Sequence, residues 1–308
     1  RHYGFAHKID NLAKAVVAAF DGICADGGFL PPADAGNRHS PPSFTNYIHA
    51  AHKLVGVKMG KANGEQCNIH TEFVDHLERR GLTKEKMMIE SIGTIVGNRF
   101  WALNKNAALF YGLASTITDF LSHEQKALRK AKGANAPENQ LEQSVRTLST
   151  FSLQFAGCSE ATIDANKARV LTELRVMGAW HYALFVPALR DSVESVICAS
   201  DQASVIQAIQ AFALRVRDDE AFARLLSTKH DAPITYKNMS GRRVQGPLQQ
   251  GESLPAAFES ESQEEAYARI CAATANDELA VQLLQDSAAQ IVKAVSYTHL
   301  RAHETRHD

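Results

Sequence analysis

The sequence predicts an all-α protein: two packed helical lobes with a C-terminal helical arm after a flexible loop. Three observations support this class. Apolar residues recur every three or four positions along most of the chain. Residues that favour helix N-termini stand in front of several of these runs. Apolar runs with the strict alternation of a half-buried strand are not evident. We therefore expect at least eight helices, and little or no sheet, between residues 8 and 295.

The first half is expected to consist of short helices followed by a long hydrophobic block. An alanine-rich helix is predicted over residues 8–20, and the paired glycines and prolines of residues 22–42 predict a loop. Gly81 is expected to end a later helix. The most hydrophobic block, residues 88–130, predicts one long helix or two stacked ones. The residues expected to cap helices along the whole chain are Ser43, Asn68, Thr83, Ser159 and Ser200.

The second half alternates helical patterns with two polar stretches. The bridge KGANAPENQ, residues 132–140, is the predicted boundary between lobes. Pro187 is expected to bend or end a helix. Residues 232–262 hold three prolines and three glycines and predict an exposed loop. Helix resumes from residue 263, with a break expected near Asn276.

These signals divide the chain into five segments. They are an N-terminal helical lobe (1–132), a second helical lobe (133–232), a flexible loop (233–262), an acidic helical arm (263–295) and a terminal segment (296–308). Apolar residues central to the helical patterns are expected to be buried. They are Ile92, Val96, Leu113, Ile117, Leu148, Phe151, Leu174 and Phe212.

The terminal segment reads SYTHLRAHETRHD. Its histidines, His299, His303 and His307, recur every four residues, a spacing that on a helix can present a metal site. The string closely resembles a translated sequencing-adaptor read-through found at the ends of many unrelated reading frames. The resemblance covers only residues 296–308, and it implies that they do not belong to the natural protein.

Charge is distributed unevenly along the chain. Residues 1–250 hold 29 Lys and Arg against 24 Asp and Glu, whereas residues 251–295 hold 2 against 8. The five cysteines are scattered and form no C-x-x-C pair, which suits a reducing compartment and predicts a cytoplasmic protein. The longest apolar stretch, residues 108–121, is too short and too polar to span a bilayer, so no membrane association is expected.

One candidate site is a set of histidines and carboxylates. They could supply nitrogen and oxygen ligands to a metal, or acid–base groups to an enzyme pocket between helices. Helical phase turns the first two histidines away from the apolar stripe, and no H-E-x-x-H or repeated E-x-x-H motif supports a metal. No nucleophile or phosphate-loop motif is present either. We therefore assign no catalytic residue, metal or cofactor. The residues are His49, His52, His70, His76, Glu72 and Asp75.

Clustered cations are the stronger signal. Cations beside aromatic rings are what single-stranded nucleic acid binds, because phosphates pair with the charges and bases stack on the rings. Cations late in a helix also complement its dipole, so a structural interpretation stays open. The candidate nucleic-acid-binding residues are Arg99, Trp101, Lys105, Lys126, Arg129, Lys130, Arg242 and Arg243.

The sequence therefore favours a helical binding or assembly protein over an enzyme. The predicted architecture is analogous to nucleocapsid or coat-like proteins, and to nucleic-acid-associated proteins of phages and plasmids. Expected partners are single-stranded nucleic acid and a second copy of the chain, the latter through the acidic arm. The alternative is an all-α enzyme or metal-binding protein that uses the histidines and carboxylates.

Overall fold

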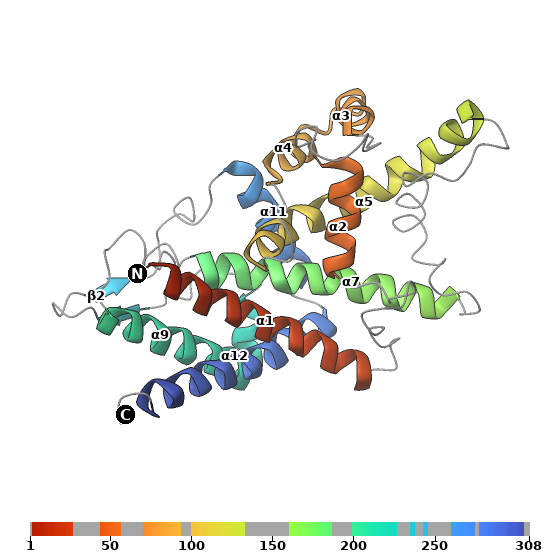
Figure 1. Ribbon diagram of the computed structural model, residues 1–308. Coiled ribbons are helices and arrows are strands. Elements are labelled where there is room, and N and C mark those ends of the chain that lie inside the picture. Colours follow the sequence, from red (N-terminus) through yellow and green to blue (C-terminus); the bar gives the residue numbers. More distant parts are fainter. Residues whose placement is uncertain are drawn as a thin grey trace. The chain divides into compact units, whose positions relative to one another are not determined.

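The computed structural model describes residues 2–26, 44–56, 70–93, 100–132, 160–186, 199–226, 235–237, 243–245, 260–274 and 277–304. They form ten α-helices, one π-helix and two three-residue strands (Figure 1). The all-α prediction and the expectation of at least eight helices are confirmed. The chain divides into two compact units. Unit 1 is Arg1–Ile23 with Arg175–Asp308, and unit 2 is Cys24–Leu174.

Unit 2 is built around one long helix, α5. The middle of α5 is buried, with Leu109, Phe110 and Leu113 wholly inaccessible to solvent. Helices α2 and α4 pack against α5, and α3 packs against α2 and α4. At this packing, the rings of Phe73 and His76 on α3 meet the edge of Phe120 on α5 at centroid distances of 5.1 and 5.2 Å. The helices of this unit are α2 (Phe44–Val55), α3 (His70–Arg79), α4 (Thr83–Ser91), α5 (Phe100–Lys132) and the first part of α7 (Glu160–Trp180).

Helix α3 ends at a glycine because the backbone there is left-handed. Gly81 has a φ of 68°, a left-handed backbone conformation that would be strained for a residue with a side chain. Its N–H donates to the carbonyl of Glu78 at 3.0 Å, and the N–H of Leu82 donates to that of Leu77 at 2.9 Å. This pair of bonds is a Schellman motif, which satisfies two carbonyls at the helix end. The predicted helix end at Gly81 is confirmed.

The hydrophobic block of residues 88–130 forms parts of two helices and not one long helix. Two helices were one of the two arrangements expected. Helix α4 ends at Ser91 and α5 begins at Phe100. Asn106 of α5 reaches back to the intervening segment: its amide accepts from the N–H of Gly93 at 3.2 Å and donates to the carbonyl of Gly93 at 3.3 Å. The side chain of this buried asparagine thus gives the N–H and the carbonyl of Gly93 the hydrogen-bond partners that a helix would otherwise supply.

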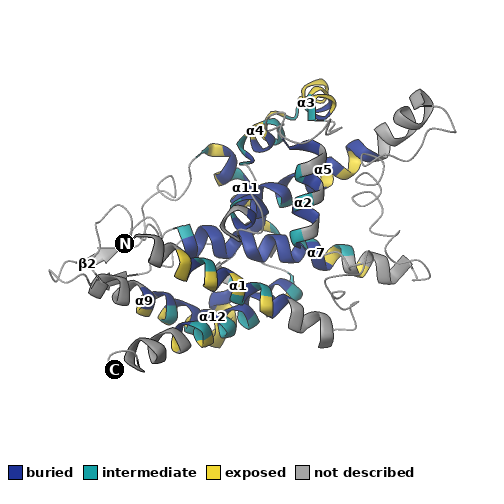
Figure 2. Ribbon diagram, in the orientation of Figure 1, coloured by how far each residue is buried: buried dark blue, intermediate teal, exposed yellow. Residues whose placement is uncertain are grey.

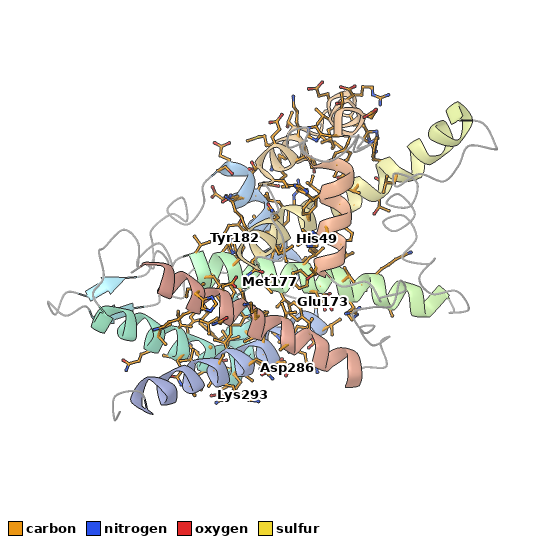
Figure 3. All side chains as sticks on the ribbon, viewed as in Figure 1. His49, Glu173, Met177, Tyr182, Asp286 and Lys293 are labelled. Carbon is orange, nitrogen blue, oxygen red and sulfur yellow. The ribbon has the colours of Figure 1, made fainter. Side chains whose placement is uncertain are left out.

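A buried ion pair lies on α7 within unit 2. The guanidinium of Arg169 donates to the carboxylate of Glu173, one helical turn further on. The two side chains are 4% and 2% exposed. The second oxygen of Glu173, which is labelled in Figure 3, accepts from the backbone N–H of Phe44 at 3.0 Å, at the first residue of α2. One carboxylate therefore neutralises a buried cation and satisfies a free donor at the start of a helix.

In the described part of unit 1, the most extensive helix packing is between α9 and α12. Helix α12 packs along α9, and Leu283, Leu284 and Ile291 of α12 are buried. The residues predicted to form an acidic arm thus lie mainly in α11 and α12. The elements of this unit are most of α1 (His2–Asp26), the rest of α7, the π-helix η2 (His181–Phe185), α9 (Ala199–Asp218), α10 (Glu220–Leu226), β1 (Thr235–Lys237), β2 (Arg243–Gln245), α11 (Glu261–Thr274) and α12 (Glu278–Glu304).

In unit 1, the end of α7 and the adjoining η2 are buried all round, from Arg175 to Phe185 (Figure 2). A helix without a solvent face must satisfy its polar groups internally. The guanidinium of Arg175 donates to the carbonyl of Ala273 at 2.9 Å and also pairs with Asp277. The indole N–H of Trp180 donates to Ser287 Oγ at 2.7 Å. These bonds tie α7 to α11 and α12.

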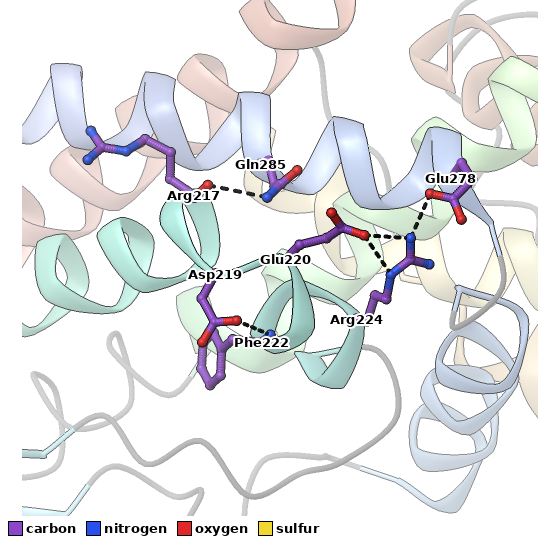
Figure 4. A network of polar contacts seen from close by, with 7 residues as sticks. All are labelled: Arg217, Asp219, Glu220, Phe222, Arg224, Glu278 and Gln285. Atoms are coloured by element: carbon purple, nitrogen blue, oxygen red, sulfur yellow. Dashed lines mark hydrogen bonds and ion pairs between the residues drawn. The ribbon is translucent and has the colours of Figure 1, made fainter.

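Aspartates cap two helices of unit 1. Asp219 accepts from the N–H of Phe222 at 2.9 Å at the start of α10 (Figure 4). Asp277 accepts from the N–H of Ala280 at 3.1 Å at the start of α12. Arg224 of α10 joins the two helices, bonding Glu220 at 2.7 Å and Glu278 at 2.6 Å. The helix break expected near Asn276 is confirmed, because α11 ends at Thr274 and α12 begins at Glu278.

Two of the predicted caps are wrong. Thr83 is the first residue of α4, and the preceding Leu82 holds the cap position without a side-chain bond. The Schellman motif already fixes the backbone at Leu82, so α4 begins without a polar cap. Ser200 lies inside α9, which begins at Ala199. Ser43, Asn68 and Ser159 lie outside the described residues, immediately or shortly before α2, α3 and α7.

The predicted core is confirmed wherever the structure describes it. Five of its residues are at most 7% exposed, and they are Ile92, Leu113, Ile117, Leu174 and Phe212. Val96, Leu148 and Phe151 lie outside the described residues. The predicted boundary after residue 132 and most of the predicted loop 233–262 also lie outside the described residues. Within that loop, β1 and β2 pair antiparallel, with Tyr236 opposite Val244. Within the described segments, no helix is long and apolar enough to cross a membrane.

Candidate nucleic-acid interface

Five of the eight candidate residues lie on one helix. Trp101, Lys105, Lys126, Arg129 and Lys130 all belong to α5 in unit 2. In unit 1, Arg243 begins β2. Arg99 and Arg242 lie outside the described residues.

The residues on α5 do not form one compact site. At a rise of 1.5 Å per residue, the 21 positions between Lys105 and Lys126 separate their backbones by about 32 Å. Lys105 is half-buried, and its neighbours Leu103 and Asn104 are buried. A single contact surface for nucleic acid therefore cannot be formed by Lys105 together with the C-terminal end of α5, unless the ligand runs along the helix.

The C-terminal end of α5 has the strongest positive charge in this helix. Lys126, Arg129, Lys130 and Lys132 fall within seven residues that contain no carboxylate. In the buried middle of α5, the solvent-exposed positions are Ser115, Thr118 and Asp119. At 100° per residue, positions 126, 129 and 130 have the same helical phase as these three residues. We call positions 126–132 the α5 basic end.

Two other cations of unit 2, Lys86 and Arg80, lie close to carboxylates. Lys86 Nζ lies 2.5 Å from a carboxylate oxygen of Glu78 and 3.9 Å from one of Glu90. The hydrogen bond to Glu78 raises the pKa of the Lys86 ammonium. Arg80 lies 3.9 Å from Asp119. These neutralised cations offer less charge to a phosphate than the same residues would alone.

The four candidate histidines are spread over the unit. His49 and His52 on α2 are half-buried, although helical phase predicted that both would face away from the core. His70 Nδ1 lies 2.7 Å from the carbonyl oxygen of Val55. His76 is buried against Phe120. The imidazole of His76 is thus used in packing, and that of His70 contacts the end of α2.

The described residues bring together no group of three side chains that could hold a metal ion. Glu72 and Asp75, the carboxylates considered with the histidines, are exposed on α3 beside Glu78 and Arg79. Burial, followed by the nearby charge of His49, lowers the pKa of His52. A neutral imidazole near pH 7 can accept a proton.

Several polar residues of structural consequence escaped sequence reasoning. Arg169 and Glu173 are four positions apart in a helical segment, and that spacing usually indicates an exposed ion pair. Asp219 and Asp277 each precede a short helical run, and Asp is a strong cap residue. Attention to every Asp before a helix, rather than only to Ser, Thr and Asn, could have found these two caps.

The comparisons with known proteins give no relative for this chain: no family model, curated protein or solved structure matches it.

Proposed function

We propose that this protein is a helical binding protein that contacts single-stranded nucleic acid through the α5 basic end. One observation carries the proposal. Four cations occupy seven residues at the end of a 33-residue helix, and three of these positions have the same helical phase as the exposed Ser115, Thr118 and Asp119. A row of cations on one helix face is what binds a phosphate backbone by releasing counterions.

The buried part of the same helix supports the proposal by giving the basic end a rigid base. Residues 103–121 of α5 are anchored in the core of unit 2. A helix held in this way presents its last turns at little cost in ordering, which favours binding. Complementing the helix dipole is the competing explanation, but one or two cations in the last turn suffice for it.

The experiment is a salt titration of binding to a fluorescent single-stranded oligonucleotide. Wild type is compared with the double variant Arg129→Ala/Lys130→Ala. Each lost phosphate contact should flatten the slope of log affinity against log salt by about 0.7. The double variant should therefore show a slope flatter by about 1.4, with weaker binding of every sequence tested.

The matched control is Lys84→Ala/Lys86→Ala, which removes the same charge from α4. The expected result is a slope close to that of wild type, because Lys86 is already paired with Glu78. Equal weakening by both double variants would mean that net charge, and not the α5 basic end, attracts the oligonucleotide. Absence of binding at low salt would contradict the proposal altogether.

Two further parts of the predicted interface are tested in the same assay. Trp101→Ala should weaken binding with little change in slope if the indole stacks on a base, because stacking releases few ions. Arg243→Ala tests the hairpin of unit 1. Self-association, the other predicted partnership, is measured by light scattering across the same salt range.

A further inference from the structure

A groove of about 360 Å³ lies within unit 1, between α1, α9 and α12. Its apolar lining consists of Leu12 and Ala15 from α1, Ile206 from α9, and Ala294 and Val295 from α12. Small-molecule sites in proteins are of this kind: concave, mainly apolar and from about 300 Å³ upward in volume. The groove is therefore large enough for one small apolar ligand.

Polar groups enter the groove from both walls. Lys8 and Asn11 come from α1, one to two turns before Ala15, and Gln290 and Lys293 come from α12. Figure 1 shows that α1 and α12 run in roughly opposite directions, with the N-terminus and the C-terminus toward the same side of this unit. Lys8 is the first lining residue on α1, and Lys293 lies between Gln290 and the apolar Ala294 and Val295 on α12. The groove thus has one ammonium group on each of these two helices.

Neither lysine is neutralised within the described part of the chain, where no carboxylate pairs with Lys8 or Lys293. The nearest acidic residue on α1, Asp10, pairs instead with Lys14 at 3.4 Å. Both lysines are exposed, so they can approach a bound anion without first breaking an internal ion pair. An apolar groove with an available ammonium group on each of two lining helices is complementary to a molecule with an anionic head and an apolar chain.

We propose that this groove binds a single-chain anionic amphiphile of the alkyl carboxylate class. Lys8 and Lys293 would hold the carboxylate, and Asn11 and Gln290 can donate further hydrogen bonds to it. The alkyl chain would lie on Leu12, Ala15 and Ile206. The span from Lys8 to Ala15 is about 10 Å along α1, which corresponds to a chain of roughly eight to ten carbon atoms.

Isothermal titration calorimetry with octanoate, decanoate and decyltrimethylammonium, each below its micelle concentration, tests the proposal. Each buried methylene tightens binding by about fourfold, so decanoate should bind about 16-fold more tightly than octanoate, with one molecule per chain. The cationic amphiphile has the same chain but the wrong charge and should bind much more weakly. Equal binding of the two decyl compounds would overturn the proposal, because it would show apolar adsorption only.

Substitutions locate the site. Lys8→Gln and Lys293→Gln should each weaken decanoate binding several-fold, whereas Lys84→Gln, an exposed lysine of unit 2, should not. Ala15→Phe should block the groove, and Ala18→Phe, at an exposed position of the same helix, is its matched control. The lysine variants lie on the surface and should fold normally, so they test the site even if Ala15→Phe disturbs α1. Decanoate binding that survives both lysine variants unchanged would contradict the assignment.

Discussion

Arginine–carboxylate contacts occur in both units, in opposite environments. In unit 2, Arg169 and Glu173 are 4% and 2% exposed. In unit 1, Arg224 is 30% exposed, and its partners Glu220 and Glu278 are 61% and 80% exposed. Water already solvates the second set, so its Coulomb attraction is weak and largely offset by side-chain entropy. The first set has lost its water, and each charge depends on the other.

The comparison teaches that the same chemical pair has a different role in each place. Glu173 also accepts the first N–H of α2, a residue 129 positions away in the sequence. Its carboxylate therefore joins α7 to α2 within unit 2, and water cannot take over both of its contacts. The contacts of Arg224 join α10 to α12, whereas α9 and α12 also pack directly against each other.

The largest expected effect follows from breaking the buried pair. Glu173→Leu should lower the free energy of unfolding by about 3–5 kcal/mol, because it leaves the Arg169 charge buried without its carboxylate. Arg169→Met/Glu173→Leu should recover most of this loss, since two apolar side chains need no counterion. Arg224→Gln, the exposed counterpart, should have the same free energy of unfolding as wild type. Urea unfolding followed by circular dichroism measures all three, and a full-sized loss in the double variant would show that the bond to Phe44 is the larger contribution.

The helical class could be predicted from the sequence because it depends on local patterns. Gly81 ended a helix as expected since only glycine tolerates its left-handed backbone without strain. Leu113 and Phe212 were correctly predicted as buried from spacing alone. Each of these residues reports on its own helix, so no knowledge of distant residues was needed.

The buried charges could not be predicted in the same way. A Glu four positions after an Arg is typical of a solvent-exposed helix face. Its burial depends on the elements that surround α7, and these come from distant parts of the sequence. The groove of unit 1 has the same origin, because α1 and α12 stand at opposite ends of the chain. For the nucleic-acid candidates, the sequence predicted the group of cations at the α5 basic end. It did not show that Lys105 is far from this group, because that follows from the length of α5, which is 33 residues.

A smaller effect is expected at Asp277, which lies between the two extremes of burial. Asp277→Ala removes the cap of α12, which costs about 1 kcal/mol, and also removes a partner of the buried Arg175. Asp219→Ala removes only a cap, at α10. The difference between the two losses of unfolding free energy therefore measures the contribution of the Arg175–Asp277 ion pair. Fluorescence of Trp180, made the sole tryptophan by Trp101→Phe, reports unfolding of unit 1, and equal losses would mean that the pair contributes nothing.

The smallest expected effect is a pH dependence in unit 2 that comes from His52. Burial, and then the charge of His49, lowers the pKa of His52 below its ordinary value of 6.5. The unfolded chain therefore binds a proton more readily than the folded one, so stability rises with pH across this interval. The contribution is fully present above pH 6.5, declines as the pH falls toward the lowered folded pKa, and changes no further below it.

Urea unfolding between pH 5 and 8 tests this dependence by the difference between wild type and variants, because other histidines titrate over the same range. His52→Gln should remove the His52 contribution and flatten the profile. His49→Gln should restore only part of the shift, since burial is the first cause and the His49 charge the second. Ring-proton resonances followed by NMR assign the titration to the residue. A folded-state pKa of His52 at or above 6.5 would contradict the prediction, and the pH dependence of unit 2 would then have to come from its other ionisable groups.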